Sequence, residues 1–88
     1  MRCSDLRRVT IESGIEEIEK RAFSSCVNLQ LVTIPNSVTK IGSFAFNNCT
    51  DLREVIIKGN VNIDKSAFKG CRNLSNIVLE QGANTIGD

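Results

Sequence analysis

Histidine, tryptophan and tyrosine are all absent from this chain of 88 residues. Without histidine, the chain lacks the commonest metal ligand and the only side chain whose ordinary pKa lies near neutral pH. It also lacks a glycine-rich phosphate loop and any set of serine, histidine and aspartate. We therefore expect neither catalysis nor a bound cofactor.

Long apolar runs are missing as well. No segment approaches the roughly 20 apolar residues of a membrane helix, and residues 1–8 lack the apolar core of a secretory signal. Either the protein is intracellular or these residues belong to a longer secreted chain. Charge of one sign is not in excess, because 11 basic and 10 acidic residues leave a formal net charge of +1. The sequence therefore predicts no membrane insertion and no nucleic-acid partner.

The acidic residues show one local cluster, at Glu16, Glu17 and Glu19. Two basic residues, Lys20 and Arg21, follow it directly. We interpret the cluster as a solvated face with local charge pairing and not as a catalytic carboxylate pair.

A repeat of about 23 residues governs what the chain does contain. Its cysteines, phenylalanines and leucines form columns, and the third interval of the cysteine column is shorter than the first two by a single residue. The residue missing from this third interval falls beside Asn62. We expect one array over residues 1–88, belonging to a longer array, with coils at about 3–25, 26–48, 49–70 and a partial coil at 71–88.

Eight columns of the repeat are apolar and hold 30 of the 36 hydrophobic residues. One coil cannot bury such a face alone, but stacked coils bury a continuous core between them. Within one unit, Leu29, Val32 and Ile34 alternate like the inward residues of a strand, and equivalent strands are expected to pair in a parallel sheet. A second extended piece is expected over 38–41, and a turn of helix over 43–48.

The repeat is clearest at residues 34–49, which read Ile-Pro-Asn-Ser-Val-Thr-Lys-Ile-Gly-Ser-Phe-Ala-Phe-Asn-Asn-Cys. This motif and its weaker copies resemble the units of the BspA-like (Treponema pallidum type) leucine-rich repeat family. Local departures include the proline, which only the unit with Pro35 keeps. The resemblance implies an α/β repeat solenoid, a right-handed leucine-rich-repeat superhelix with one parallel sheet of short strands and short helical turns on the opposite side.

The same resemblance implies a style of function. Members of this family are surface-exposed or secreted and are frequently linked to adhesion. It therefore implies a non-catalytic protein–protein interaction module of a cell-surface adhesin, whose partner is a protein, such as a host or matrix protein. The alternative is an architectural spacer whose repeats lengthen a larger protein without contacting anything.

The cysteine column, formed by Cys3, Cys26, Cys49 and Cys71, contains no C-x-x-C pair and cannot gather into a tetrahedral zinc site. Stacked side chains point the same way, so we expect buried, reduced thiols that act as small core hydrophobes. The alternative is one disulfide between adjacent coils, and a nucleophilic cysteine is disfavoured because no base lies nearby.

A short polar residue stands two positions after each cysteine. These residues are Asp5, Asn28, Asp51 and Asn73. Such side chains bond to their own backbone, so we expect a turn that leads into the strand. A calcium site is the sharper alternative, but one oxygen ligand per coil falls short of the six or more that calcium takes.

The strand register leaves a second, outward face. If Val32 and Ile34 point inward, Leu31 and Thr33 point outward. The outward positions of all four coils are Arg8, Thr10, Leu31, Thr33, Glu54, Ile56, Asn76 and Val78. Repeat proteins bind partners across such extended faces, so we interpret this set as the candidate partner-binding face, although exposed β-branched residues are also common without function.

The ends of the array carry the last expectation. Solenoids need capping units with polar outer faces, and the first and last coils of this chain show none. We therefore expect end-to-end self-association, unless further repeats cover these ends.

Overall fold

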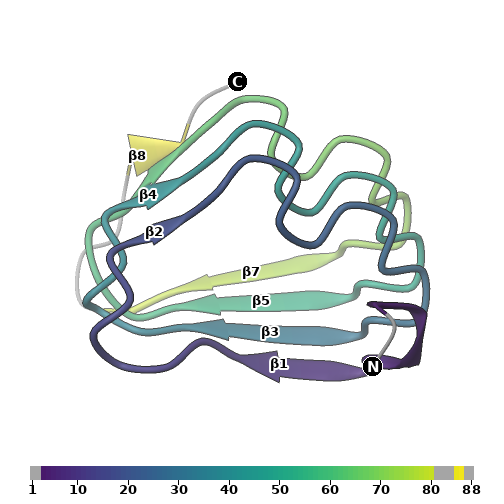
Figure 1. Ribbon diagram of the computed structural model, residues 1–88, viewed down its shortest axis with the longest axis horizontal. Helices are drawn as coiled ribbons and strands as arrows, with labels where there is room; N and C mark the ends of the chain where they lie inside the picture. Colours follow the sequence, from purple (N-terminus) through teal and green to yellow (C-terminus); the bar gives the residue numbers. More distant parts are fainter. Residues whose placement is uncertain (1–2, 81–84, 87–88) are drawn as a thin grey trace.

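Each coil contributes two short strands, and equivalent strands of successive coils lie side by side (Figure 1). The computed structural model describes residues 3–80 and 85–86. The first sheet has the order β1 (Arg8–Thr10), β3 (Leu31–Ile34), β5 (Glu54–Ile57), β7 (Asn76–Leu79). The second has the order β2 (Glu17–Ile18), β4 (Lys40–Ile41), β6 (Asn62–Ile63), β8 (Thr85–Ile86). A 3-10 turn, η1 (Cys3–Asp5), precedes β1.

The pairing of the strands repeats the sequence period residue for residue. All strand pairs are parallel, and Val9 pairs with Val32, which pairs with Val55. Ile57 still pairs at the full period, with Ile34, whereas Asn62 pairs with Lys40, which is one residue closer in the sequence. The residue missing from the third interval therefore lies between Ile57 and Asn62. The repeat solenoid expected from the sequence is confirmed.

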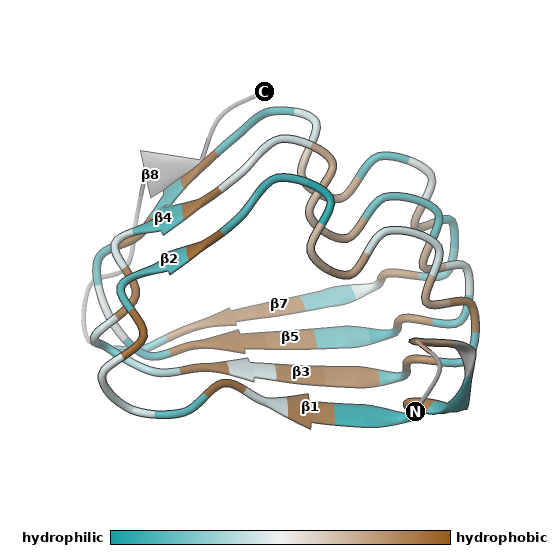
Figure 2. Cartoon of the chain, viewed as in Figure 1, coloured by the Kyte–Doolittle hydropathy of each residue, from teal (hydrophilic) through white to brown (hydrophobic). Residues whose placement is uncertain are grey.

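The core is a set of columns that run along the stack of coils. Figure 2 shows hydrophobic residues recurring at matching places along the stacked strands. The fully buried residues with the largest side chains all come from the second and third coils: Phe46, Leu29, Ile34, Ile41, Leu52, Ile57, Val32, Val38, Val55, Cys26 and Cys49. Equivalent positions in the outer coils are more open, because a neighbouring coil covers them on one side only. Ile15 is 43% exposed and Leu79 is 41% exposed, although both were expected in the core.

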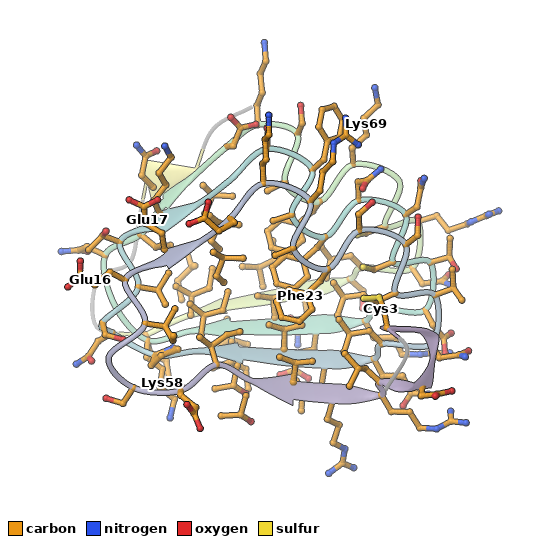
Figure 3. The ribbon with its side chains drawn as sticks, in the orientation of Figure 1. Cys3, Glu16, Glu17, Phe23, Lys58 and Lys69 are labelled. Carbon is orange, nitrogen blue, oxygen red and sulfur yellow. A yellow bond between two sulfur atoms is a disulfide. The ribbon has the colours of Figure 1, made fainter. Side chains whose placement is uncertain are left out.

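The phenylalanine column shows the same dependence on neighbours. The ring of Phe46 lies between the rings of Phe23 and Phe68, with centroids 5.1 and 5.3 Å away and interplanar angles of 5° and 6°. Phe46 is fully buried, whereas its two neighbours are half-buried. In Figure 3, Phe23 lies in the interior, between the first sheet and the opposite side of the coil. Contacts between stacked aromatic rings add stability beyond that of the buried area. Phe46 makes two such contacts, whereas each of its neighbours makes one with it.

Two expectations about the second half of the coil need correction. Of the extended piece expected over 38–41, only Lys40–Ile41 is a strand, β4, and it belongs to a second parallel sheet, so the fold has two sheets and not one. The helical turn expected at 43–48 is wrong, because these residues form turns, and among the described residues only η1 is helical.

The physical reason for the missing helix is the use of the backbone between coils. The amides of Phe46 and Asn48 donate to the carbonyls of Ala67 and Lys69 in the next coil, at 2.8 and 2.7 Å. Phe44 and Asn48 also have positive φ angles, of 57° and 59°, which interrupt a right-handed helix. These residues therefore complete the hydrogen bonding between coils on the side that the sheets leave open.

The asymmetry of the phenylalanine column gives a stability test. We predict that Phe46→Leu lowers the free energy of unfolding by about 2 kcal/mol and Phe23→Leu by about 1 kcal/mol, because the first change removes two ring contacts and the second removes one. Urea unfolding at a fixed redox state measures both values. Equal losses for the two variants would contradict the stacking explanation.

Candidate protein-binding surface

Alternation along the strands of the first sheet separates an inner from an outer face. In β3, Val32 and Ile34 are fully buried, while Leu31 and Thr33 between them are half-buried. The same alternation holds in β5. Because the strands are parallel and in register, the outward side chains of successive coils form straight rows.

The structure places all eight residues of the candidate partner-binding face in two such rows. The first row is Arg8, Leu31, Glu54 and Asn76. The second row is Thr10, Thr33, Ile56 and Val78. Each row brings together side chains from four successive coils, which lie far apart in the sequence.

The outer face carries three apolar side chains among polar ones. Ile56 pairs directly with Val78, and Leu31 lies diagonally from Ile56 on the adjacent strand. All three are half-buried, because their neighbours in the rows cover part of each side chain. Arg8 lies at one end of the first row, and Glu54 stands between Leu31 and Asn76. The face therefore combines a line of apolar side chains, from Leu31 through Ile56 to Val78, with charges of both signs.

The acidic cluster lies elsewhere, on and beside the second sheet. Glu16, Glu17 and Glu19 are exposed, and Figure 3 shows Glu16 and Glu17 at the periphery of the fold. A shallow hollow of about 290 Å³ between Glu17, Lys20, Lys40 and Asp64 carries side chains of both charges on walls that are about half apolar. Within residues 3–80 and 85–86, no three cysteine, aspartate or glutamate side chains are grouped to hold a metal ion. The described part of the chain also contains no helix long and apolar enough to cross a membrane.

The short polar residues after the cysteines lie in turns, as expected. Residues 27–28, 50–51 and 72–73 are turns, and Asp5 ends η1. The side-chain amide of Asn73 donates to the carbonyl of Thr50 at 2.7 Å, and Asp51 lies 3.8 Å from the guanidinium of Arg53. At Asn73 the column therefore ties one coil to the coil before it.

The cysteine column differs from the expectation of four reduced thiols. Cys3 and Cys26 form a disulfide between adjacent coils, with their Cα atoms 5.1 Å apart. The expectation of reduced thiols is therefore wrong at these two positions, and the alternative, one disulfide between adjacent coils, is correct. The reason is that the sulfurs of Cys3 and Cys26 point toward each other along the stack, whereas they were expected to point the same way. Cys49 and Cys71 carry free thiols, the first buried and the second half-buried.

The two free thiols influence each other. A hydrogen bond with Cys71 raises the pKa of Cys49 well above its ordinary value, and burial raises it further. The same hydrogen bond lowers the pKa of Cys71. Both thiols also donate to backbone carbonyls, Cys49 to that of Phe23 and Cys71 to that of Phe46.

Sequence reasoning missed several surface features. The guanidinium of Arg21 lies over the ring of Phe44, 4.9 Å from its centroid, and both residues have positive φ angles that no composition signal indicates. Val27 is 42% exposed, outside the candidate face. The open side of the first coil forms an apolar hollow of about 380 Å³, whose walls include Ile11, Ile15 and Phe23. The hollow was not predicted, because these columns were expected to be buried in every coil.

Comparison with known proteins agrees with the geometry. The model of the BspA type leucine-rich repeat region, described as six copies, matches residues 1–88. No curated protein and no solved structure matches this chain significantly. The match covers the whole chain and agrees with the parallel solenoid, whose coils follow the sequence repeat. The chain therefore belongs to the BspA-type leucine-rich repeat family.

Proposed function

We propose that this chain is a non-catalytic protein-interaction module of a cell-surface or secreted adhesin. It binds a protein, such as a host or matrix protein, across the outward face of β1, β3, β5 and β7. The leucine-rich repeat family supports the coarser part of this proposal, since such repeats mediate protein–protein interaction. The observation that carries the finer part is the gathering of Leu31, Ile56 and Val78 on one ordered face.

The physical argument is one of preorganisation. Interfaces are dominated by a few apolar or aromatic anchors surrounded by polar groups that exclude water. On this face the anchors are Leu31 and Ile56, with Arg8 and Glu54 at the rim. Because the strand ladders hold the backbone beneath them, little conformational freedom is lost when a partner binds.

The disulfide gives independent support for the compartment. Disulfides persist in oxidising environments such as the cell surface and the extracellular space, and are rare where glutathione keeps thiols reduced. The bond between Cys3 and Cys26 therefore favours a surface or secreted location.

A binding test separates the interaction module from the architectural spacer. We predict that the double change Leu31→Asp and Ile56→Asp weakens binding to an immobilised matrix protein by about 100-fold or more, because it puts charge at both anchors. Val27→Asp places the same charge on an exposed valine outside the face, and it should bind like the unchanged chain. Biosensor titration against a panel of matrix proteins measures the affinities, with circular dichroism checking the fold.

Two outcomes would contradict the proposal. If the folded double variant bound a panel member as tightly as the unchanged chain, the anchors would be wrong. If the unchanged, folded chain bound no member of the panel, a matrix partner would be wrong and the spacer would be favoured.

A second copy of the chain is also proposed as a partner, end to end. The open side of the first coil presents the apolar hollow, and at the other end of the first sheet β7 exposes Ile77 and Leu79. In the inner coils, the side chains equivalent to these exposed ones are covered by a neighbouring coil. A coil of another copy therefore has the complementary shape.

This contact predicts a mass that depends on concentration. Light scattering of the chain should show association that increases with protein concentration, and Ile15→Lys should reduce it by placing a charge in the apolar hollow. A folded chain that stays monomeric up to millimolar concentration would contradict end-to-end association. It would not bear on the proposal that the outward strand face binds a partner.

A further inference from the structure

The free cysteines share one local environment, shifted by one coil. The Cys49 sulfur lies 3.2 Å from the carbonyl oxygen of Phe23, and the Cys71 sulfur lies 2.9 Å from that of Phe46. The same two carbonyls accept the backbone amides of the preceding column members, that of Phe23 from Cys26 at 3.3 Å and that of Phe46 from Cys49 at 3.4 Å. Each sulfur therefore lies against the turn that leads into the previous cysteine of the column.

One pair of cysteines that are neighbours in the column is already joined by a disulfide. Cys26 is joined to Cys3, one coil earlier. Cys71 stands in the same relation to Cys49, because the Cys71 sulfur and the Cys49 amide both donate to the carbonyl of Phe46. Four cysteines can form two disulfides in three ways. In only one of them, Cys3–Cys26 with Cys49–Cys71, do both bonds join neighbours in the column. We propose that Cys49 and Cys71 form a second disulfide, and that the pair is a site of reversible oxidation.

The chemistry of the pair assigns a role to each sulfur. Cys71 is half-buried whereas Cys49 is buried, and the neighbouring Cys49 lowers the pKa of Cys71, so Cys71 is the attacking thiolate. Cys49 is buried and its pKa is raised, so it stays protonated during the first step. The oxidant is a low-molecular-weight disulfide such as oxidised glutathione.

The electrons balance over two exchanges. The Cys71 thiolate attacks one sulfur of the oxidant, forms a mixed disulfide and releases one thiolate. Cys49 then gives its proton to that thiolate or to water and attacks the Cys71 sulfur, which releases the second small thiolate. This thiolate takes up the proton that Cys71 lost to the solvent before the first step. In total, one small disulfide is reduced to two thiols, and the two protein thiols are oxidised to the Cys49–Cys71 bond.

The bond would fix part of the candidate face. Residues 49–71 include β5, and Cys71 precedes β7, so the disulfide joins the two coils that carry Ile56 and Val78. Closing this loop also restricts the unfolded chain. Oxidation is therefore expected to raise the thermal midpoint by about 10 °C, whatever the partner of the face.

Mapping the disulfides before and after oxidation tests the proposal. The chain is incubated with oxidised glutathione, alkylated under denaturing conditions, and digested with trypsin without reduction. Cleavage after lysine and arginine places the four cysteines in separate peptides: 3–7, 22–40, 41–53 and 70–72. Mass spectrometry should show the 3–7 to 22–40 cross-link at the start and an added 41–53 to 70–72 cross-link after oxidation, together with the higher thermal midpoint.

Other products would overturn the proposal. These are persistent alkylation of Cys49 and Cys71, a dominant cross-link between 22–40 and 41–53, or glutathione that remains on Cys71 of the unchanged chain. None of these outcomes bears on partner binding by the strand face.

Two variants test the assigned roles. Cys49→Ala should trap glutathione on Cys71, because the second sulfur is gone. Cys71→Ser should leave Cys49 at least about 10-fold slower to react than Cys71 is in Cys49→Ala, because Cys49 is buried and protonated. Equal rates would contradict the assigned order of attack.

Discussion

A single coil of this chain has too little interior to bury its own apolar side chains, so each coil depends on the coils beside it. The contacts between coils are close enough to restrict the backbone. A Cβ atom on Gly42 would lie 2.7 Å from the Lys20 backbone nitrogen in the previous coil, so the second coil needs glycine here. Phe46, covered on both sides, is fully buried, whereas Phe23 has a ring neighbour on one side only. Stacking thus determines burial, backbone spacing and the rows of outward side chains together.

This dependence also divides the chemistry of the chain. The inner columns are occupied by packing, and the outward rows around Leu31 and Ile56 remain available to a partner. The cysteine column belongs to both parts, because its sulfurs pack in the core and face one another along the stack. Stacking that forms a core therefore also brings together cysteines that lie a full repeat apart in the sequence, as the bond between Cys3 and Cys26 shows.

Much of the fold could be predicted from the sequence because the repeat supplies each position several times over. The period, the inward strand residues and the membership of the outward rows follow from the columns. The turns at 43–48 could not be predicted, since so short a segment shows no period and the left-handed backbone of Phe44 carries no sequence signal. The disulfide depended on the direction of the sulfurs, and the exposure of Ile15 on its position in an outer coil; neither is a property of the column alone.

Amide hydrogen exchange of the intact chain tests most directly whether the coils stabilise one another. If burial between coils holds the fold together, the strand amides that bond to a neighbouring coil should exchange at least about 10-fold more slowly in β3 and β5 than in β1, which has a partner strand on one side only. Protection that is uniform across β1, β3 and β5, or strongest in β1, would contradict it.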